Sequence, residues 1–114
     1  MDLEISSERT EDGIAVIQVT GELDLYTAPS LKEHLLSALE DGALKVVIDM
    51  SGVHFIDSSA LGVLIGGVKR LKPNDGRLVL VCVDENVNWI FRITGLNNVF
   101  DIFASREEAL ASFS

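Results

Sequence analysis

Two short, mainly apolar segments constrain the fold of this 114-residue chain more than any other feature of its sequence. They are KVVIDM at residues 45–50 and RLVLVCV at residues 77–83, and a segment long enough for a helix separates them. A strand that is apolar along its length is typical of a sheet covered on both faces. Two such strands joined through a helix run parallel, because a parallel pair needs a long crossover connection. The sequence therefore predicts an α/β sandwich.

The rest of the chain alternates between strand-like and helix-like segments. GIAVIQVTG at residues 13–21 is rich in β-branched residues, and the EDG before it suits a hairpin turn from a weaker strand, LEISSER. Thr27 has the residue type of an N-cap for the first helix. Further elements are predicted as helices at 27–42, 59–71 and 85–94, a short strand at 99–103 and a last helix that Ser105 begins. The predicted order is β-β-α-β-α-β-α-β-α, in one α/β domain with a mixed sheet over residues 1–114.

Composition and charge limit the compartments and partners that suit the chain. The formal net charge is −9, which argues against nucleic acid and anionic membranes, since both require clusters of Lys and Arg. The acidity suits a basic protein partner, and it equally suits solubility alone. No apolar run reaches the ~18 residues of a membrane span. The N-terminus lacks a secretory apolar segment, and the lone Cys82 excludes a disulfide framework. We expect a cytoplasmic protein that binds neither nucleic acid nor membrane.

Asp57, Ser58 and Ser59 lie where a predicted strand ends and a predicted helix begins. Asp and Ser are both good N-cap residues, so one interpretation is that they only cap the helix. The other is that Ser58 accepts a phosphoryl group. The start of a helix offers free N–H groups and the positive end of the helix dipole, which tolerate added negative charge. A phosphate, with about −1.5 to −2 charges, would change the surface there without unfolding the helix. The spacing alone leaves both interpretations open.

Three glycines interrupt the apolar helix that follows. An interior glycine costs a helix up to about 1 kcal/mol relative to alanine, so something should compensate for it. Gly62 and Gly66 fall on one line with Ser58 at steps of four residues, while Gly67 falls on another line. The line is a nearly smooth strip. It suits close packing on a neighbouring helix, or docking of another protein, and the two uses are compatible.

Residues suited to catalysis or metal binding are few and scattered. His34, predicted on a solvated helix face, and His54, predicted in a loop near Ser58, have no partners at a metal-site spacing. The sequence contains no glycine-rich phosphate loop, and Trp89 is expected to be a partly buried packing residue. Asp49 lies near the end of a buried strand, as the phosphoacceptor of response-regulator receivers does, but that chemistry needs an acidic pair after the first strand and a later lysine, whereas Glu11-Asp12 falls in a hairpin turn and no lysine follows Lys72. We expect no metal, no cofactor and no enzymatic activity.

Three blocks of the sequence carry a resemblance to a known family: TGELDLYTAP (20–29), VVIDMSGVHFIDSSALGVL (46–64) and IFRITGLNNVFDIFAS (90–105). Through them the chain resembles the anti-sigma factor antagonists of the STAS domain family, of the SpoIIAA, RsbV and BldG type. The resemblance covers essentially the whole chain, and IDSSALG is its most specific part. It implies that Ser58 is the phosphoacceptor, that Ser59 matches a neighbouring Ser/Thr position, and that Asp24 supports contact with the kinase and partner. Ala60 replaces a glycine that is common in the family, which bears on how closely a partner approaches.

The resemblance also implies a mechanism of partner switching. The unphosphorylated antagonist binds an anti-sigma factor and thereby frees a sigma factor for RNA polymerase. The anti-sigma factor is a serine kinase of the GHKL type that phosphorylates Ser58 and ends the complex, and a PP2C-type phosphatase removes the phosphate. The family expectation is a monomer. The predicted partner-binding residues are Asp24, Asp57, Ser58, Ser59, Ala60, Gly62 and Gly66.

Two other functions stay open on the sequence alone. The first is a small nucleotide-binding protein, since weak nucleotide binding has been proposed within the family, although this sequence offers no phosphate loop. The second is a STAS module that only assembles larger complexes. Such a module needs no phosphorylatable residue after the aspartate, whereas this chain has Ser58 there.

Overall fold

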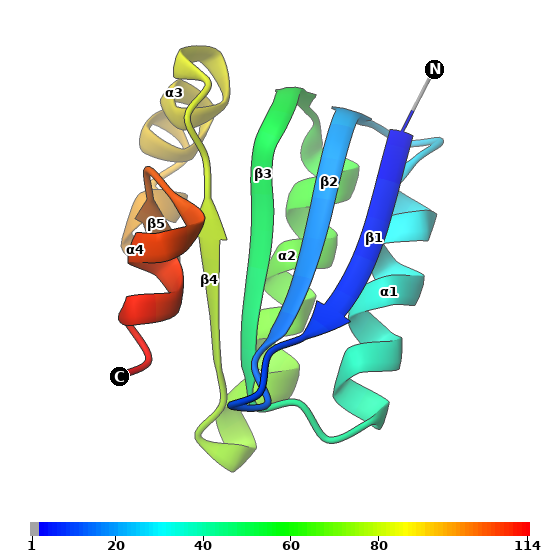
Figure 1. Cartoon of the computed structure of the whole chain (residues 1–114). Helices are drawn as coiled ribbons and strands as arrows, with labels where there is room; N and C mark the ends of the chain where they lie inside the picture. Colours follow the sequence, from blue (N-terminus) through cyan, green and yellow to red (C-terminus); the bar gives the residue numbers. More distant parts are fainter. Residues whose placement is uncertain (1–2) are drawn as a thin grey trace.

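The computed structural model describes residues 3–114, which form a five-stranded sheet with helices on both faces (Figure 1). The elements in chain order are β1 (Leu3–Arg9), β2 (Ala15–Leu23), α1 (Ala28–Glu40), β3 (Lys45–Ile56), α2 (Ser58–Leu71), β4 (Arg77–Val81), α3 (Glu85–Ile93), β5 (Asp101–Phe103) and α4 (Arg106–Ala111). Short 3₁₀ turns follow α2 at Lys72–Asn74 and α3 at Leu96–Asn98. No helix within residues 3–114 has both the length and the apolarity needed to cross a membrane. The predicted order of elements is confirmed.

The strands lie in the sheet in their chain order, β1-β2-β3-β4-β5. β1 pairs with β2 in antiparallel orientation, and β2, β3, β4 and β5 pair in parallel. The antiparallel pair turns at residues 10–14, where the Thr10 N–H donates to the Ile14 carbonyl over 2.9 Å. Each parallel pair requires a crossover, and α1, α2 and α3 supply the three crossovers. The predicted mixed sheet with an antiparallel first pair is confirmed.

Two hydrophobic clusters lie on the two faces of the sheet. The larger one gathers α1, α2 and α3 against one face and fully buries Leu31, Leu64 and Phe91. The smaller one lies under α4, where Ala109 packs with Val47 and Val79. Figure 1 shows α1 and α2 on the far side of the sheet and α4 on the near side of β4. Because helices cover both faces of β3 and β4, the apolar segments that predicted these strands have no polar face over most of their length.

Several predicted boundaries differ from the structure. β3 runs to Ile56 rather than ending near residue 50, because β2 continues beside it, through two register shifts, as far as Leu23. His54 therefore lies on a strand and not in a loop. The other differences are small: β4 ends at Val81, β5 spans only Asp101–Phe103, and α2 begins one residue earlier, at Ser58.

Two predicted environments are wrong. Trp89, expected to be partly buried, is 54% exposed, because Val87 and Phe91 fill the positions of α3 that face the core. His34, expected on a solvated face of α1, is half-buried, and its Nδ1 lies 2.6 Å from the Ser7 hydroxyl on β1. α1 packs beside the edge strand β1, which partly covers a side chain that the helical pattern alone places in solvent.

Candidate functional site

The ends of β2 and β3 bring the two most specific sequence segments together. Leu23 lies opposite Ile56 in the parallel pair, and the Asp57 N–H donates to the Leu23 carbonyl over 3.0 Å. Parallel strands place their carboxyl ends at the same edge of a sheet. The turn that contains Asp24 and the junction that contains Ser58 are therefore neighbours in space.

Asp57 is the N-cap residue of α2. Its backbone is extended (φ −117°, ψ −178°), and its Oδ1 accepts hydrogen bonds from the N–H groups of Ser59 (2.9 Å) and Ala60 (3.3 Å). Ser58 is the first residue of the helix and is exposed, and its hydroxyl makes no hydrogen bond to any residue between 3 and 114. The capping role belongs to Asp57, which leaves the Ser58 hydroxyl at the positive end of α2 with no structural task.

Asp24 is buried and shapes the turn between β2 and α1. Only 5% of the residue is exposed. Its Oδ1 accepts hydrogen bonds from the N–H groups of Tyr26 (2.9 Å) and Thr27 (3.0 Å). Its Oδ2 is buried and has no hydrogen-bond partner in the part of the chain that the structure describes. Asp24 therefore holds the turn and does not present its carboxylate at the surface.

Thr27 occupies the N-cap position of α1, as predicted, but its side chain makes no cap hydrogen bond. Its hydroxyl instead donates to the Glu22 carbonyl (2.7 Å) and accepts from the Asp24 N–H (2.9 Å). These bonds tie the start of α1 back to the end of β2. Thr27 and Asp24 together thus fix the turn that lies beside Ser58.

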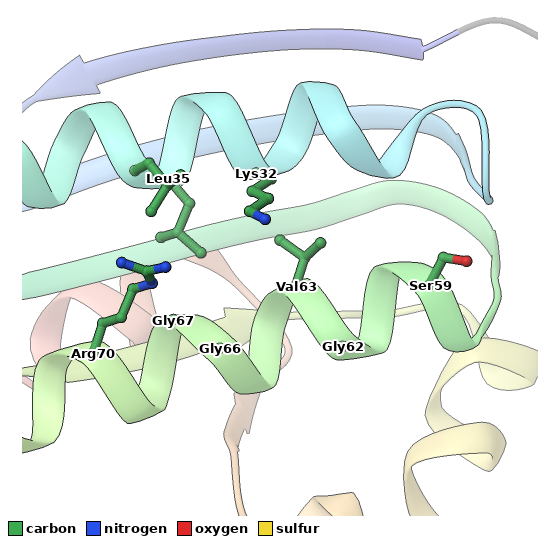
Figure 2. A pocket seen from close by; sticks show the side chains of 9 residues that line it. Lys32, Leu35, Ser59, Gly62, Val63, Gly66, Gly67 and Arg70 are labelled. Carbon is green, nitrogen blue, oxygen red and sulfur yellow. The ribbon is translucent and has the colours of Figure 1, made fainter.

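A groove runs along α2, between α2 and α1 (Figure 2). Its volume is ≈ 260 Å³, and it is lined from α1 by Lys32, Leu35 and Leu36 and from α2 by Ser59, Val63, Arg70 and the three glycines. Figure 2 shows Ser59 at one end of the groove and Arg70 at the other. The groove therefore begins beside Ser58 and follows α2 toward its C-terminal end.

The glycines of α2 are of two kinds. A Cβ atom at Gly67 would lie 2.7 Å from Leu35 Cδ2 and 3.0 Å from Leu78 Cδ1, so packing accounts for this glycine. A Cβ atom at Gly62 or Gly66 would meet nothing within 4 Å. The fold does not need glycine at these two positions, where the missing side chains widen the groove. Of the two uses inferred from the sequence, packing applies to Gly67, and docking stays a hypothesis for Gly62 and Gly66.

Ala60, predicted as a partner-binding residue, lies in the core. It is 0% exposed and belongs to the larger hydrophobic cluster, so its methyl group does not reach the surface. The other predicted residues differ in accessibility: Asp24 is buried, Asp57, Ser59 and Gly66 are half-buried, and Ser58 and Gly62 are exposed. The exposed and half-buried residues are accessible from the surface, whereas Asp24 and Ala60 support the structure beneath it.

Comparison with known proteins tests whether the chain as a whole belongs to the predicted family. The family model of the STAS domain matches residues 7–109, from β1 into α4. The chain belongs to the STAS domain family. The family that the sequence blocks predicted is thereby confirmed.

Several proteins similar to this STAS chain are anti-sigma factor antagonists. The anti-sigma-B factor antagonist of Staphylococcus aureus (strain NCTC 8325 / PS 47) is 34% identical over 93 residues, which cover 82% of this chain and 86% of that protein. The crystal structure of an anti-sigma factor antagonist from Mycobacterium paratuberculosis has a TM-score of 0.88 at 28% identity, over 97% of this chain and 93% of that one. SpoIIAA, a Bacillus cell fate determinant solved in its phosphorylated form, shares the fold with a TM-score of 0.76 at 22% identity, over 97% and 100% of the two chains.

The sequence analysis missed three exposed apolar side chains at this edge of the STAS domain. Leu25 is 63% exposed and Tyr26 is 78% exposed in the turn that Asp24 holds, and Phe55 is 46% exposed on β3. Phe55 pairs in the sheet with Glu22, close to the base of the same turn. The available signal was an apolar pair, Leu25–Tyr26, in a segment with no helical or strand periodicity. We call Leu25, Tyr26 and Phe55 the tip residues.

The titratable groups of this STAS domain indicate what its surface offers chemically. Within residues 3–114, no group of three His, Cys, Asp or Glu side chains is placed to hold a metal ion. Burial raises the pKa of the Cys82 thiol to about 11, so Cys82 is neutral and a poor nucleophile at neutral pH. Asp49 is buried, and Arg106 Nε donates to its Oδ2 over 2.9 Å. What the site offers is an exposed hydroxyl at a helix start, with a groove and three exposed apolar side chains beside it.

Proposed function

We propose that this STAS domain is an anti-sigma factor antagonist that works by partner switching. In its unphosphorylated form it binds an anti-sigma factor, which releases a sigma factor to RNA polymerase. The anti-sigma factor is itself a serine kinase of the GHKL type, phosphorylates Ser58 and thereby ends the complex, and a PP2C-type phosphatase restores the antagonist. The chain acts as a monomer in the cytoplasm. It is a substrate and a competitor, not an enzyme.

The accessibility of the Ser58 hydroxyl is the observation that carries this proposal. Asp57 caps α2 with its own carboxylate, so Ser58 can be modified without loss of the cap. The similarity to the S. aureus antagonist supports the function, and a protein of the same fold, SpoIIAA, is known in a phosphorylated form. Together these observations favour Ser58 as the phosphoacceptor.

A phosphate on Ser58 would act on the partner rather than on the fold. It would bring about −1.5 to −2 charges, which the free N–H groups and the dipole of α2 stabilise at this position. The same charges, next to Asp57, disfavour a partner that packs there, because repulsion and desolvation in an interface cost several kcal/mol. We expect the affinity to fall by a factor of about 10²–10³.

The test measures binding of wild type, Ser58→Ala and Ser58→Asp to the purified GHKL-type anti-sigma factors of the same organism. We expect calorimetry to show that Ser58→Ala binds as wild type does and that Ser58→Asp binds about 100-fold more weakly. Ser6→Asp is the matched control. Ile5 packs against the larger cluster, so the neighbouring Ser6 points to the opposite face of the sheet, away from α2.

Phosphorylation is tested in the same system by intact-mass spectrometry after incubation with Mg-ATP. We expect one phosphate on wild type and none on Ser58→Ala. A phosphate that persists on the variant would move the site, first of all to Ser59. Equal affinity of Ser58→Ala and Ser58→Asp would remove the switch and favour a module that only assembles complexes.

A further inference from the structure

The groove between α1 and α2 carries two cations, Lys32 and Arg70, with no acidic partner within residues 3–114. Figure 2 shows Lys32 reaching from α1 toward α2, and Arg70 reaching from α2 toward α1. No salt bridge within residues 3–114 involves either side chain. Their own helices supply no carboxylate, because the positions one turn away hold Ala, Pro and Leu around Lys32 and Gly, Pro and Asn around Arg70. Within residues 3–114, Arg77 and Arg106 are the only Lys or Arg residues paired with carboxylates, so the location of Lys32 and Arg70 in one groove matters more than the lack of a bridge.

The two cations of the groove lie in a molecule whose overall charge is opposite to theirs. The chain has a net charge of −9, with 18 Asp and Glu residues against nine Lys and Arg residues. Lys69 and Lys72 are exposed near Arg70 and add to the positive charge at the C-terminal end of α2. A groove with several cations in and near it, in an otherwise acidic molecule, offers a local complement to negative charge. The occupant of the groove should therefore carry carboxylates.

The shape of the groove indicates the form of the occupant. About three helical turns, or roughly 16 Å, separate Ser59 from Arg70 along α2. Gly62 and Gly66 leave the floor without side chains, and Leu36 and Val63 add apolar surface on the two sides. Bare positions on a helix let a second helix approach closely, and an apolar groove between helices receives the apolar face of an amphipathic helix.

We propose that the α1–α2 groove is the seat of an amphipathic helix of the anti-sigma factor, whose apolar face lies on Gly62, Val63 and Gly66 and whose carboxylates pair with Lys32 and Arg70. This inference rests on the proposed function and specifies its interface. It also explains how one modification acts on the contact. The groove starts at Ser59, so one end of the helix lies beside Ser58, and a phosphate there repels carboxylates at that end.

Charge reversal in the groove tests the pairing. The probe is the purified anti-sigma factor that binds wild type in the Ser58 experiment. Lys32→Glu/Arg70→Glu should weaken its binding by about tenfold or more, because two attractions become repulsions. Lys45→Glu/Arg92→Glu makes the same change of net charge at two exposed residues outside the groove and should change the affinity by less than about twofold. Equal affinity of the two double variants would overturn the inference.

Cross-linking of the unmodified complex tests the same contact with the wild-type chain, so its result does not depend on the folding of a variant. A carbodiimide joins an amine to a carboxylate in direct contact, so it should link Lys32 to an Asp or Glu of the anti-sigma factor. We expect that residue to lie on a helix, and its replacement by Lys to restore affinity for the Lys32→Glu chain. A cross-link to a non-helical segment, or no cross-link from Lys32, would contradict the proposal. Saturable binding of ATP in the groove without the anti-sigma factor would also contradict it, because the groove would then be a nucleotide site.

The outcomes separate this inference from the proposed function. If Ser58→Asp releases the anti-sigma factor while Lys32→Glu/Arg70→Glu still holds it as wild type does, partner switching stands and the helix is seated elsewhere. If no GHKL-type anti-sigma factor of the organism binds wild type, both the function and the groove inference are overturned.

Discussion

Asp57 and Ser58 differ in role through backbone geometry, not through residue type. Asp57 holds the extended conformation of an N-cap, and its carboxylate binds two N–H groups of α2. Asp57→Ala should therefore lower the free energy of unfolding by about 1 kcal/mol. Ser58→Ala should change it by less than about 0.5 kcal/mol, because the hydroxyl has no structural partner among residues 3–114. Urea denaturation of both variants measures the difference, and a larger loss for Ser58→Ala would reverse the assignment of the cap.

The sequence located this junction but did not show which residue caps the helix and which has an exposed hydroxyl. Both residue types are good N-caps, and a shift of one position exchanges their functions. The first helical residue follows from the length of β3, which continues to Ile56 because it pairs with β2. Similarly, the family pattern predicted Asp24 near the site, but its burial depends on the turn around it and could not be read from its position in the chain.

Arg106 joins α4 to three neighbouring strands of the sheet, β1, β2 and β3. Its guanidinium donates to Asp49 Oδ2 (2.9 Å), Glu8 Oε1 (2.7 Å) and Gln18 Oε1 (2.8 Å). No local pattern predicts such a contact, because its members come from β1, β2, β3 and α4. Asp49, which resembles a receiver phosphoacceptor in sequence position, is instead the buried anchor of this network.

Asp49 should make stability depend on pH in the acid range. Burial raises the pKa of Asp49, but hydrogen bonds from Ser51 and Arg106 outweigh burial and hold the pKa below its ordinary value of 3.8. A group with a lowered folded-state pKa contributes stability that is complete above the unfolded-state value and is lost as the pH falls through the folded-state value. Wild type should therefore exceed Asp49→Asn in unfolding free energy near neutral pH, and the gap should shrink below about pH 3.8.

Urea denaturation of the two chains at about pH 6 and about pH 3 measures this gap. Asp12→Asn serves as the control, because Asp12 is an exposed carboxylate in the turn between β1 and β2 and forms no salt bridge within residues 3–114. A gap between wild type and Asp49→Asn that is the same at both pH values would show that the charge of Asp49 does not contribute to stability.

At the scale of elements, α2 gives up stability at two glycines that its own packing does not require. Gly62→Ala and Gly66→Ala should each raise the free energy of unfolding by about 0.5–1 kcal/mol, since alanine favours the helix and its Cβ meets nothing within 4 Å. Gly67→Ala should be less stable than either by about 1 kcal/mol or more, because its Cβ would press on Leu35 and Leu78. Thermal or urea unfolding of the three variants ranks them, and equal stabilities would contradict the distinction.

The same series links stability to binding. If the bare positions serve a partner, Gly66→Ala should bind the anti-sigma factor more weakly even as it unfolds less readily. A variant that gains both stability and affinity would leave the two glycines without a functional reason.

The elements were predictable where the local pattern and the tertiary fold agree. β3 and β4 have apolar segments because helices cover both faces, and α1 and α4 have start signals at Thr27 and Ser105 that the structure places at their N-caps. The second half of β3 was not predictable, because SGVHFI carries Gly and His and has no regular alternation. This segment is a strand because it pairs with β2 across two register shifts, and such pairing between distant segments is not visible in the local sequence.

At the scale of the whole molecule, the proposed interface gathers at one edge of the sheet and along one groove. The tip residues flank this edge, and the groove between α1 and α2 starts there. Sequence blocks identified the edge because the family motif lies in it. They did not identify the tip residues or the two cations of the groove, because exposure and position along a groove are properties of the folded chain.

A switch at such a surface requires that the molecule stay folded in both states. Ser58 lies outside the core, and the helix dipole favours negative charge at the first turn of α2 by about 0.3–1 kcal/mol, which offsets repulsion from Asp57. We therefore expect phosphorylated wild type and Ser58→Asp to unfold within about 0.5 kcal/mol of the unmodified chain. Hydrogen exchange should show the same protection of β2, β3, β4 and α2 in each form.

The variant Asp57→Ala is the reference for a weakened start of α2 in hydrogen exchange, because it removes the cap without adding negative charge. If phosphorylation speeds exchange in α2 as much as Asp57→Ala does, the modification releases the partner by melting the helix. If exchange is unchanged while the affinity falls about 100-fold, surface charge alone accounts for the release, because the binding surface is then intact and only its electrostatic potential differs.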